Sequence, residues 1–135
     1  MNPRFLTLAE IEWLHALSID EFGGGNGLRD GGAFESAANQ ARATFGGEFL
    51  HHDLFEMAAA YAFHIAQNQP FVDGNKRTGV LAAVMFLTLN GVEIVDPAEK
   101  LYDAMIAIAE RRMDKLQLAH LFRELGTARS ERTTS

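Results

Sequence analysis

The run from Gln69 to Thr78, QPFVDGNKRT, combines residue types that can hold a metal-bound phosphate. Asp73 offers hard carboxylate oxygens, and Mg²⁺ is usually held by one or two carboxylates together with substrate phosphates. Lys76 and Arg77 follow in what the pattern predicts to be the first turn of a helix. The helix dipole disfavours cations at that end, so this pair indicates an anion supplied from elsewhere.

The backbone of this run favours the same ligand. A helix beginning near Asn75 would present unpaired N–H groups to the preceding loop, and such a terminus binds phosphate. Gly74 would let the backbone approach a ligand closely. Arg77 can bind phosphate oxygens through two parallel hydrogen bonds, whereas Lys76 is a mobile point charge. Together these parts predict positioning and charge stabilisation in phosphoryl or nucleotidyl transfer.

The plain alternative is a turn with a helix cap whose two cations are exposed to solvent. That interpretation suits each residue taken singly better than it suits the whole set. The run is not a Walker P-loop, because that motif needs a GxxxxGK[ST] pattern after a strand.

Composition predicts one soluble domain. The chain has 135 residues, 47% of them hydrophobic, and no cysteine, which excludes thiol catalysis and Cys-ligated zinc. A net charge of −6 argues against direct nucleic-acid binding. No targeting segment or membrane-spanning stretch is visible, so we expect a cytoplasmic protein without membrane association.

Helix signals dominate the chain and predict an all-α single domain over residues 1–126, followed by a polar, frayed tail over 127–135. Residues 92–95 suit a short extended connector. The expected helices are one capped by Thr7 and ending by Gly23, one over 34–45 ended by Gly46–Gly47, one from Asp53 to Asn68, one from Asn75 to Asn90, one capped by Asp96 with Pro97 at its first position, and one from Asp114 to Leu125.

The motif run resembles HxFx(D/E)GN(G/K)R, the active-site motif of the Fic/Doc (Fido) family. It is most similar to the Doc toxin branch, in which lysine replaces the second glycine. The resemblance extends roughly over residues 5–125 and implies a compact, mostly helical Fido fold. The matching residues are Pro70, Phe71, Asp73, Gly74, Asn75, Lys76 and Arg77.

The resemblance also implies ATP and Mg²⁺ as cofactors. Asp73 would serve the metal, and Asn75, Lys76 and Arg77 would serve the phosphates. Phe71 would anchor the loop in the core and, with Gly74, complete the nucleotide-binding set. Doc toxins transfer the γ-phosphate of ATP to a threonine of elongation factor Tu, whereas Fic proteins generally transfer AMP. Lysine at position 76 favours the first reaction. The loop over residues 23–32 would lie near the flap that aligns the target.

A third implication is a toxin–antitoxin module. Self-inhibited Fic proteins carry an [S/T]xxxE[G/N] helix, and the nearest match here, Thr127 with Glu131, is followed by Arg132 and fits poorly. We therefore expect inhibition in trans by a separate antitoxin protein, whose glutamate would pair with Arg77.

The chain departs from the motif at Gln69, where the family has the histidine that takes the proton from the target hydroxyl. An amide cannot accept that proton at neutral pH, and general-base assistance contributes roughly 10²–10⁴ in rate. The sequence thus predicts ATP–Mg²⁺ binding with impaired or absent turnover. Gln69 could mark a natural pseudoenzyme or an engineered or selected loss. A non-catalytic module that binds nucleotide or antitoxin, and an AMP transferase, stay open as alternatives.

The five histidines offer no substitute base. His64 suits a satisfied helix histidine, and His15 and His120 suit helix-surface or boundary positions. His51 and His52 are adjacent, so they project differently, and no third metal ligand stands at a useful spacing.

Other conspicuous side chains have structural interpretations. Trp13 and Phe22 suit the core better than ligand stacking. The pair Arg111–Arg112 suits a solvated helix end, where cations are favoured.

Overall fold

The computed structural model describes residues 2–128, and within them helices dominate, as predicted. None of these helices is both long and apolar enough to cross a bilayer. The helices are α1 (Leu8–Phe22), α2 (Gly31–Asn39), α3 (Leu54–Asn68), α4 (Asn75–Leu89), α5 (Lys100–Ala109) and α6 (Lys115–Leu125), with a 3₁₀ turn η1 (Gln40–Arg42). Two small antiparallel sheets pair β1 (Thr44–Phe45) with β2 (Glu48–Phe49) and β3 (Val92–Ile94) with β4 (Gly126–Ala128).

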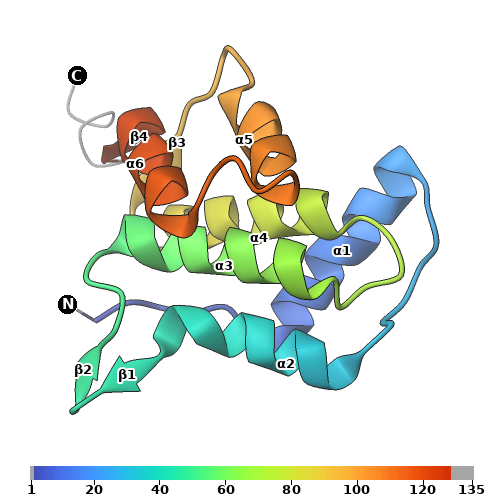
Figure 1. Cartoon of the computed structure of the whole chain (residues 1–135), viewed down its shortest axis with the longest axis horizontal. Coiled ribbons are helices and arrows are strands. Elements are labelled where there is room, and N and C mark those ends of the chain that lie inside the picture. Colours follow the sequence, from blue (N-terminus) through green and yellow to red (C-terminus); the bar gives the residue numbers. More distant parts are fainter. Residues whose placement is uncertain (1, 129–135) are drawn as a thin grey trace.

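The centre of the fold is the pair α3 and α4, which lie side by side with α2 on one side and α5 and α6 on the other (Figure 1). Gly79 on α4 permits this approach. A Cβ placed there would lie 2.8 Å from the backbone oxygen of Ala62 on α3. Since a real Cβ does not come this close to a carbonyl oxygen, only glycine suits this contact. The loop between α3 and α4 carries the motif run.

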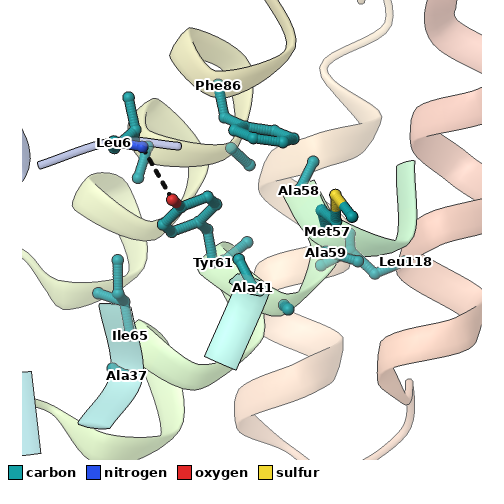
Figure 2. Packing of buried hydrophobic residues seen from close by; sticks show 14 of the residues in the cluster. Leu6, Ala37, Ala41, Met57, Ala58, Ala59, Tyr61, Ile65, Phe86 and Leu118 are labelled. Carbon is teal, nitrogen blue, oxygen red and sulfur yellow. Dashed lines mark hydrogen bonds between the residues drawn. The ribbon is translucent and has the colours of Figure 1, made fainter. Parts of the chain in front are cut away.

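Tyr61 attaches the N-terminal segment to this core. Its ring is fully buried on α3, and its hydroxyl accepts a hydrogen bond of 2.9 Å from the backbone N–H of Leu6 (Figure 2). Burial raises the pKa of the Tyr61 phenol. Phe86 of α4 packs against the ring at 5.3 Å. The segment before α1 is therefore held by a satisfied buried polar group as well as by apolar contact.

The predicted helix starts at Thr7, Asp53 and Asp114 are confirmed by side-chain caps. The Thr7 hydroxyl accepts from the Glu10 N–H while the Glu10 carboxylate accepts from the Thr7 N–H. Asp53 and Asp114 accept from the N–H three residues on, in the same way. Each cap satisfies a donor that the first helical turn leaves unpaired.

The helix predicted over residues 34–45 is wrong at both ends. It begins at Gly31 because the Asp30 carboxylate accepts from the Ala33 N–H, and its regular part ends at Asn39. Gly46 and Gly47 do not end a helix. Both have positive φ, at 61° and 82°, and form the turn of the β1–β2 hairpin. A Gly-Gly pair supplies the two left-handed residues that a tight hairpin needs.

The start predicted at Asp96 is also wrong by several residues. Pro97 lies in a turn, Glu99 adopts a left-handed conformation, and α5 begins at Lys100. The Asp96 carboxylate nevertheless caps the helix from a distance, since it accepts from the backbone N–H groups of Lys100 and Leu101.

At the C-terminal end, the described chain continues past the expected boundary at residue 126. Thr127 pairs with Glu93 and Ala128 with Val92, so the expected extended connector and the start of the expected tail form one two-stranded sheet. The remainder of that tail, residues 129–135, lies outside the described residues.

His64 on α3 faces the beginning of α6. Its Nε2 accepts a hydrogen bond from the Lys115 ammonium at 3.0 Å, so the neutral ring carries its proton on Nδ1. Burial and the nearby Lys115 charge lower the pKa of His64 to about 4 from its ordinary 6.5. Burial likewise lowers the pKa of His51. Repulsion between the His51 and His64 charges also lowers the pKa of His64. The folded state therefore favours an uncharged imidazole here.

We predict that Gly79→Ala destabilises the protein by roughly 1–3 kcal/mol, because the new methyl group overlaps the Ala62 carbonyl and forces α3 and α4 apart. Urea denaturation measures the change. Gly31→Ala is the matched control, since nothing lies within 4 Å of the added Cβ at the first residue of α2. Equal stabilities for the two variants would contradict the contact.

We predict that stability is lost as the pH falls from 6.5 towards 4, since the unfolded chain takes up a proton on His64 in that range and the folded chain resists it. The loss should be roughly 1–2 kcal/mol, allowing for solvent screening of the partly exposed ring. Urea denaturation at several pH values tests this. His64→Gln keeps an acceptor for Lys115 and should flatten the profile, whereas the exposed His52→Gln should not. An unchanged profile in His64→Gln would refute the assignment.

Candidate active site

The loop between α3 and α4 is bounded by two left-handed residues. Gln69 ends α3 with φ 47°, and Gly74 precedes α4 with φ 77°. The left-handed region costs little for glycine but strains other residues, and such strain concentrates at functional sites. Gln69 is exposed, and its backbone N–H still donates to the Ile65 carbonyl at 3.1 Å. The residue at the family's histidine position is thus held in a defined, strained conformation.

Phe71 anchors this loop in the core. Only 1% of it is exposed, and its ring stacks on His15 of α1 at a centroid distance of 3.9 Å. His15 also donates from Nε2 to the Asp73 carbonyl at 2.8 Å. The expectation that His15 lies at the surface or boundary is wrong, because the ring is buried against the loop it supports.

Asn75 holds the loop from the other end. Its Oδ1 accepts from the Phe71 N–H and its Nδ2 donates to the Phe71 carbonyl, both at 3.0 Å. Both the oxygen and the nitrogen of the side-chain amide thus make a hydrogen bond inside the loop. A phosphate contact at Asn75 would come from its backbone N–H.

The glycine-rich segment over residues 23–32 runs alongside this loop. The N–H groups of Arg29 and Asp30 donate to the Pro70 carbonyl, at 2.7 and 3.1 Å, and the Val72 N–H donates to the Gly27 carbonyl at 3.1 Å. Leu28 forms an antiparallel bridge with Phe71. Both loops lie at the same end of the molecule in Figure 1, away from the β1–β2 hairpin.

Arg29 fixes the end of α3 as well. Its Nε donates to the Gln69 carbonyl at 2.8 Å and its Nη2 to the Asn68 carbonyl at 3.0 Å. A cation at a helix C-terminus satisfies unpaired carbonyls and complements the dipole. Sequence reasoning did not identify this role, since nothing local links Arg29 to a helix end 40 residues away.

Asp73, the residue for which a metal role was expected, lines the pocket beside the α4 N-terminus. Its Oδ2 accepts from the Gly25 N–H at 2.6 Å, and its second oxygen makes no hydrogen bond with the described residues. These residues contain no group of three or more His, Cys, Asp or Glu side chains that could hold a metal. A Mg²⁺ ion on Asp73 would therefore draw its other ligands from water and phosphate, which is how magnesium binds in many nucleotide sites.

Arg77 and Lys76 point to different surroundings. Arg77 donates from Nε to the Ser18 hydroxyl at 2.9 Å and from Nη2 to the Gly23 carbonyl at 3.1 Å. Its Nη1 has no partner among the described residues. Lys76 is exposed and makes no hydrogen bond or ion pair within residues 2–128. Arg77 is thus held in place, whereas Lys76 has no partner in the described part of the chain.

The Arg77 guanidinium also lies over the ring of Phe22, 5.1 Å from its centroid. The expectation that Phe22 and Trp13 belong to the core is wrong, because they are 62% and 55% exposed. Phe22 instead provides an aromatic surface for the cation, an arrangement that favours a fixed guanidinium.

The N-terminus of α4 is open to an anion. No side chain caps it, and its first turn contains no acidic residue. The backbone N–H groups of Asn75, Lys76 and Arg77 find no acceptor in the described part of the chain. These donors and the positive dipole end make the terminus suited to phosphate.

A pocket of about 440 Å³ lies beside this terminus. It contains Gln69, Asp73 and Lys76, as the motif suggested, and it also contains Gln67 and Arg111. Gln67 and Arg111 border a second hollow of about 400 Å³, between α3 and the turn that leads into α6. The sequence offered no signal for this neighbourhood, because Arg111 lies more than 30 residues beyond the motif along the chain.

Fold and site together define a small helical domain with a pocket beside an uncapped helix N-terminus. The chain belongs to the Fic/DOC family, whose model matches residues 5–87. It is similar to the protein named "Protein kinase doc" of Escherichia phage P1, with 33% identity over 90% of this chain and 95% of that protein. It is also similar to the protein named "Toxin Doc" of Mycolicibacterium smegmatis, with 40% identity over 69% of this chain and 73% of that protein.

We predict that Asn75→Ala destabilises the protein by roughly 1–3 kcal/mol, because two hydrogen bonds are lost and the Phe71 N–H is left unsatisfied in partly buried surroundings. Urea denaturation gives the stability, and amide exchange at 70–74 reports the loop itself. Asn26→Ala serves as control, since that exposed side chain bonds only the adjacent Gly27 N–H. A loop that keeps its exchange protection in Asn75→Ala would disprove the clamp.

Proposed function

We propose that this chain is a Doc-type toxin of a toxin–antitoxin module, built to transfer the γ-phosphate of ATP to a protein hydroxyl and impaired at that step by Gln69. The observation that carries the proposal is the phosphate cradle around the α4 N-terminus, with Asp73 and Arg77 already held in place. The names of the two relatives, one a kinase and one a toxin, support it.

In this proposal each residue has a separate task. Asp73 holds Mg²⁺, which would neutralise charge on the phosphates. Arg77 and the unpaired backbone N–H groups of α4 bind the phosphate oxygens. Lys76 stabilises the negative charge that develops on the leaving group. Arg29 and Asn75 keep the loop in shape so that little reorganisation is needed at the moment of reaction.

The chemical step forms a bond between the target hydroxyl oxygen and the γ-phosphorus and breaks the bond from that phosphorus to the β–γ bridging oxygen. ADP leaves with the bridging oxygen. The hydroxyl proton must go to a base, and the amide at Gln69 cannot take it at neutral pH. We therefore propose that the chain binds ATP–Mg²⁺ and turns it over slowly or not at all.

We propose a threonine of elongation factor Tu as the target and translation as the process arrested. Lysine at position 76, rather than glycine, favours phosphoryl transfer over AMP transfer within the family's motif. The Leu28 bridge to Phe71 leaves the glycine-rich loop beside the pocket, where it would align an extended target segment.

Regulation would come from an antitoxin protein in trans. An acidic side chain of that partner would reach Arg77, whose Nη1 is available, and would occupy the position of the γ-phosphate. Gln69 also supports a second candidate function. A chain with an intact cradle and no base suits a non-catalytic module that binds nucleotide or antitoxin.

We predict that Gln69→His raises transfer from ATP to elongation factor Tu by roughly 10²–10⁴, since it restores the general base, while the Kd for ATP–Mg²⁺ changes little. Labelled-phosphate transfer and calorimetric titration measure the two quantities. Mass analysis of the product separates a phosphoryl group from AMP.

Two further variants, Gln69→Glu and Arg77→Ala, are measured in the same transfer and binding assays. The first adds a carboxylate base at the same position, and the second, in the Gln69→His background, should abolish both binding and transfer. ATP binding without any transfer in Gln69→His would favour the binding module. A modified target carrying AMP would replace the kinase assignment with AMP transfer.

A further inference from the structure

Arg111 occupies a backbone position that favours glycine. It lies two residues after Ala109, the last residue of α5, and has φ 62°. Its N–H donates to the Ile108 carbonyl at 3.0 Å, and the Arg112 N–H donates to the Ala107 carbonyl at 2.7 Å. These two bonds define the Schellman helix ending, whose left-handed residue is usually glycine and sometimes asparagine. An arginine there is strained, and nothing in the helix ending itself requires its side chain.

The side chain of Arg111 borders the pocket that also contains Lys76, Asp73 and Gln69. It makes no hydrogen bond or ion pair with any residue from 2 to 128. The neighbouring Arg112 differs in this respect, because its Nε donates to the Glu110 carboxylate at 3.0 Å. The two arginines were expected to form one solvated helix end. Both are exposed just after the end of α5, as expected, but Arg112 is paired with Glu110 whereas Arg111 is unpaired beside the pocket.

The charges around the pocket suit a ligand with more than one negative charge. Lys76 and Arg111 contribute two cations against the single carboxylate of Asp73, and the open N–H groups of α4 add to the positive side. The Arg77 guanidinium lies at another part of the same helix end, where it is hydrogen-bonded to Ser18 and Gly23. A phosphate chain lying across the α4 N-terminus would meet Arg77 on one side and Lys76 on the other.

We propose that Arg111 is a further ligand-binding residue, which contacts the phosphate chain of the nucleotide on the Lys76 side of the α4 N-terminus. This inference rests on the proposed function. It makes the turn between α5 and α6 part of the site and explains an arginine where the backbone favours glycine. Bidentate hydrogen bonding to phosphate oxygens is the chemistry that a guanidinium offers there.

Arg111→Gly tests the proposal because it should change binding and stability in opposite directions. We expect ATP–Mg²⁺ to bind roughly 3- to 10-fold more weakly, the range of a charge-assisted contact at a partly exposed site. AMP, which has one phosphate, should lose less than about 2-fold by the same reasoning. The Tm should rise by about 2–5 °C because the left-handed strain is relieved. Calorimetric titration and thermal melts measure these quantities.

Two further variants sharpen the result. Arg112→Ala is the matched control and should bind ATP–Mg²⁺ as the parent chain does. Arg111→Lys keeps the charge and the strain, so it should recover part of the affinity and none of the Tm gain. An equal loss for ATP and AMP would show that Arg111 only shapes the pocket and would overturn the inference.

The proposed function and this inference fail in different ways. If Arg77→Ala abolishes ATP–Mg²⁺ binding while Arg111→Gly binds as the parent does, the inference is overturned and the proposed function stands. If the parent chain does not bind ATP–Mg²⁺ at all, both are overturned.

Discussion

The contact between Gly79 and Ala62 is the constraint on which the rest of the molecule depends. It brings the backbones of α3 and α4 together closely enough that only a hydrogen atom fits between them. The two helices are joined by the loop 69–74, and left-handed residues at Gln69 and Gly74 bound that loop. The α4 N-terminus is consequently presented uncapped at the loop, with its N–H groups available to a ligand. The packed helix pair and its connecting loop thus place an uncapped helix N-terminus beside the pocket.

The loop does not maintain its own shape. His15 and Phe71 hold it from α1 and the core, Arg29 holds it through the end of α3, and Asn75 closes it internally. These bonds use the side chains that surround the site and leave Asp73, Lys76 and the α4 N–H groups free to meet a ligand. Such preorganisation suits electrostatic catalysis, in which the dipoles must already be aimed before charge moves. Gln69 is the only motif position at which the chain departs from its family's pattern, and its side chain is exposed beside this scaffold.

Features set by residues close together in the chain could be predicted from the sequence, whereas features set by distant contacts could not. The starts of α1, α3 and α6 were predictable because Thr7, Asp53 and Asp114 cap them from within four residues. The end of α2 was not predictable, since a Gly-Gly pair can either end a helix or form the turn of a hairpin. Here Thr44 pairs with Phe49, so the glycines form a hairpin turn. Asp96 was recognised as a cap, but the left-handed Glu99 displaced the helix start. His15 was assigned to the surface or boundary, and Trp13 and Phe22 to the core, because the apolar spacing within one helix does not show which of its faces packs against α4.

What the sequence by itself determined is the chemistry of one contiguous run: a carboxylate, a glycine, two cations at a helix start, and an amide where a base is expected. Short-range spacing is enough for this, because the helix start and the loop residues are adjacent in the chain. Only the tertiary structure decided which distant groups complete the site. Ser18 and Gly23 hold Arg77, Gly25 holds Asp73, Arg29 holds the end of α3, and Arg111 comes beside Lys76 from the turn after α5. These pairings are set by how the helices pack, and packing depends on contacts between residues whose separation along the chain carries no signal.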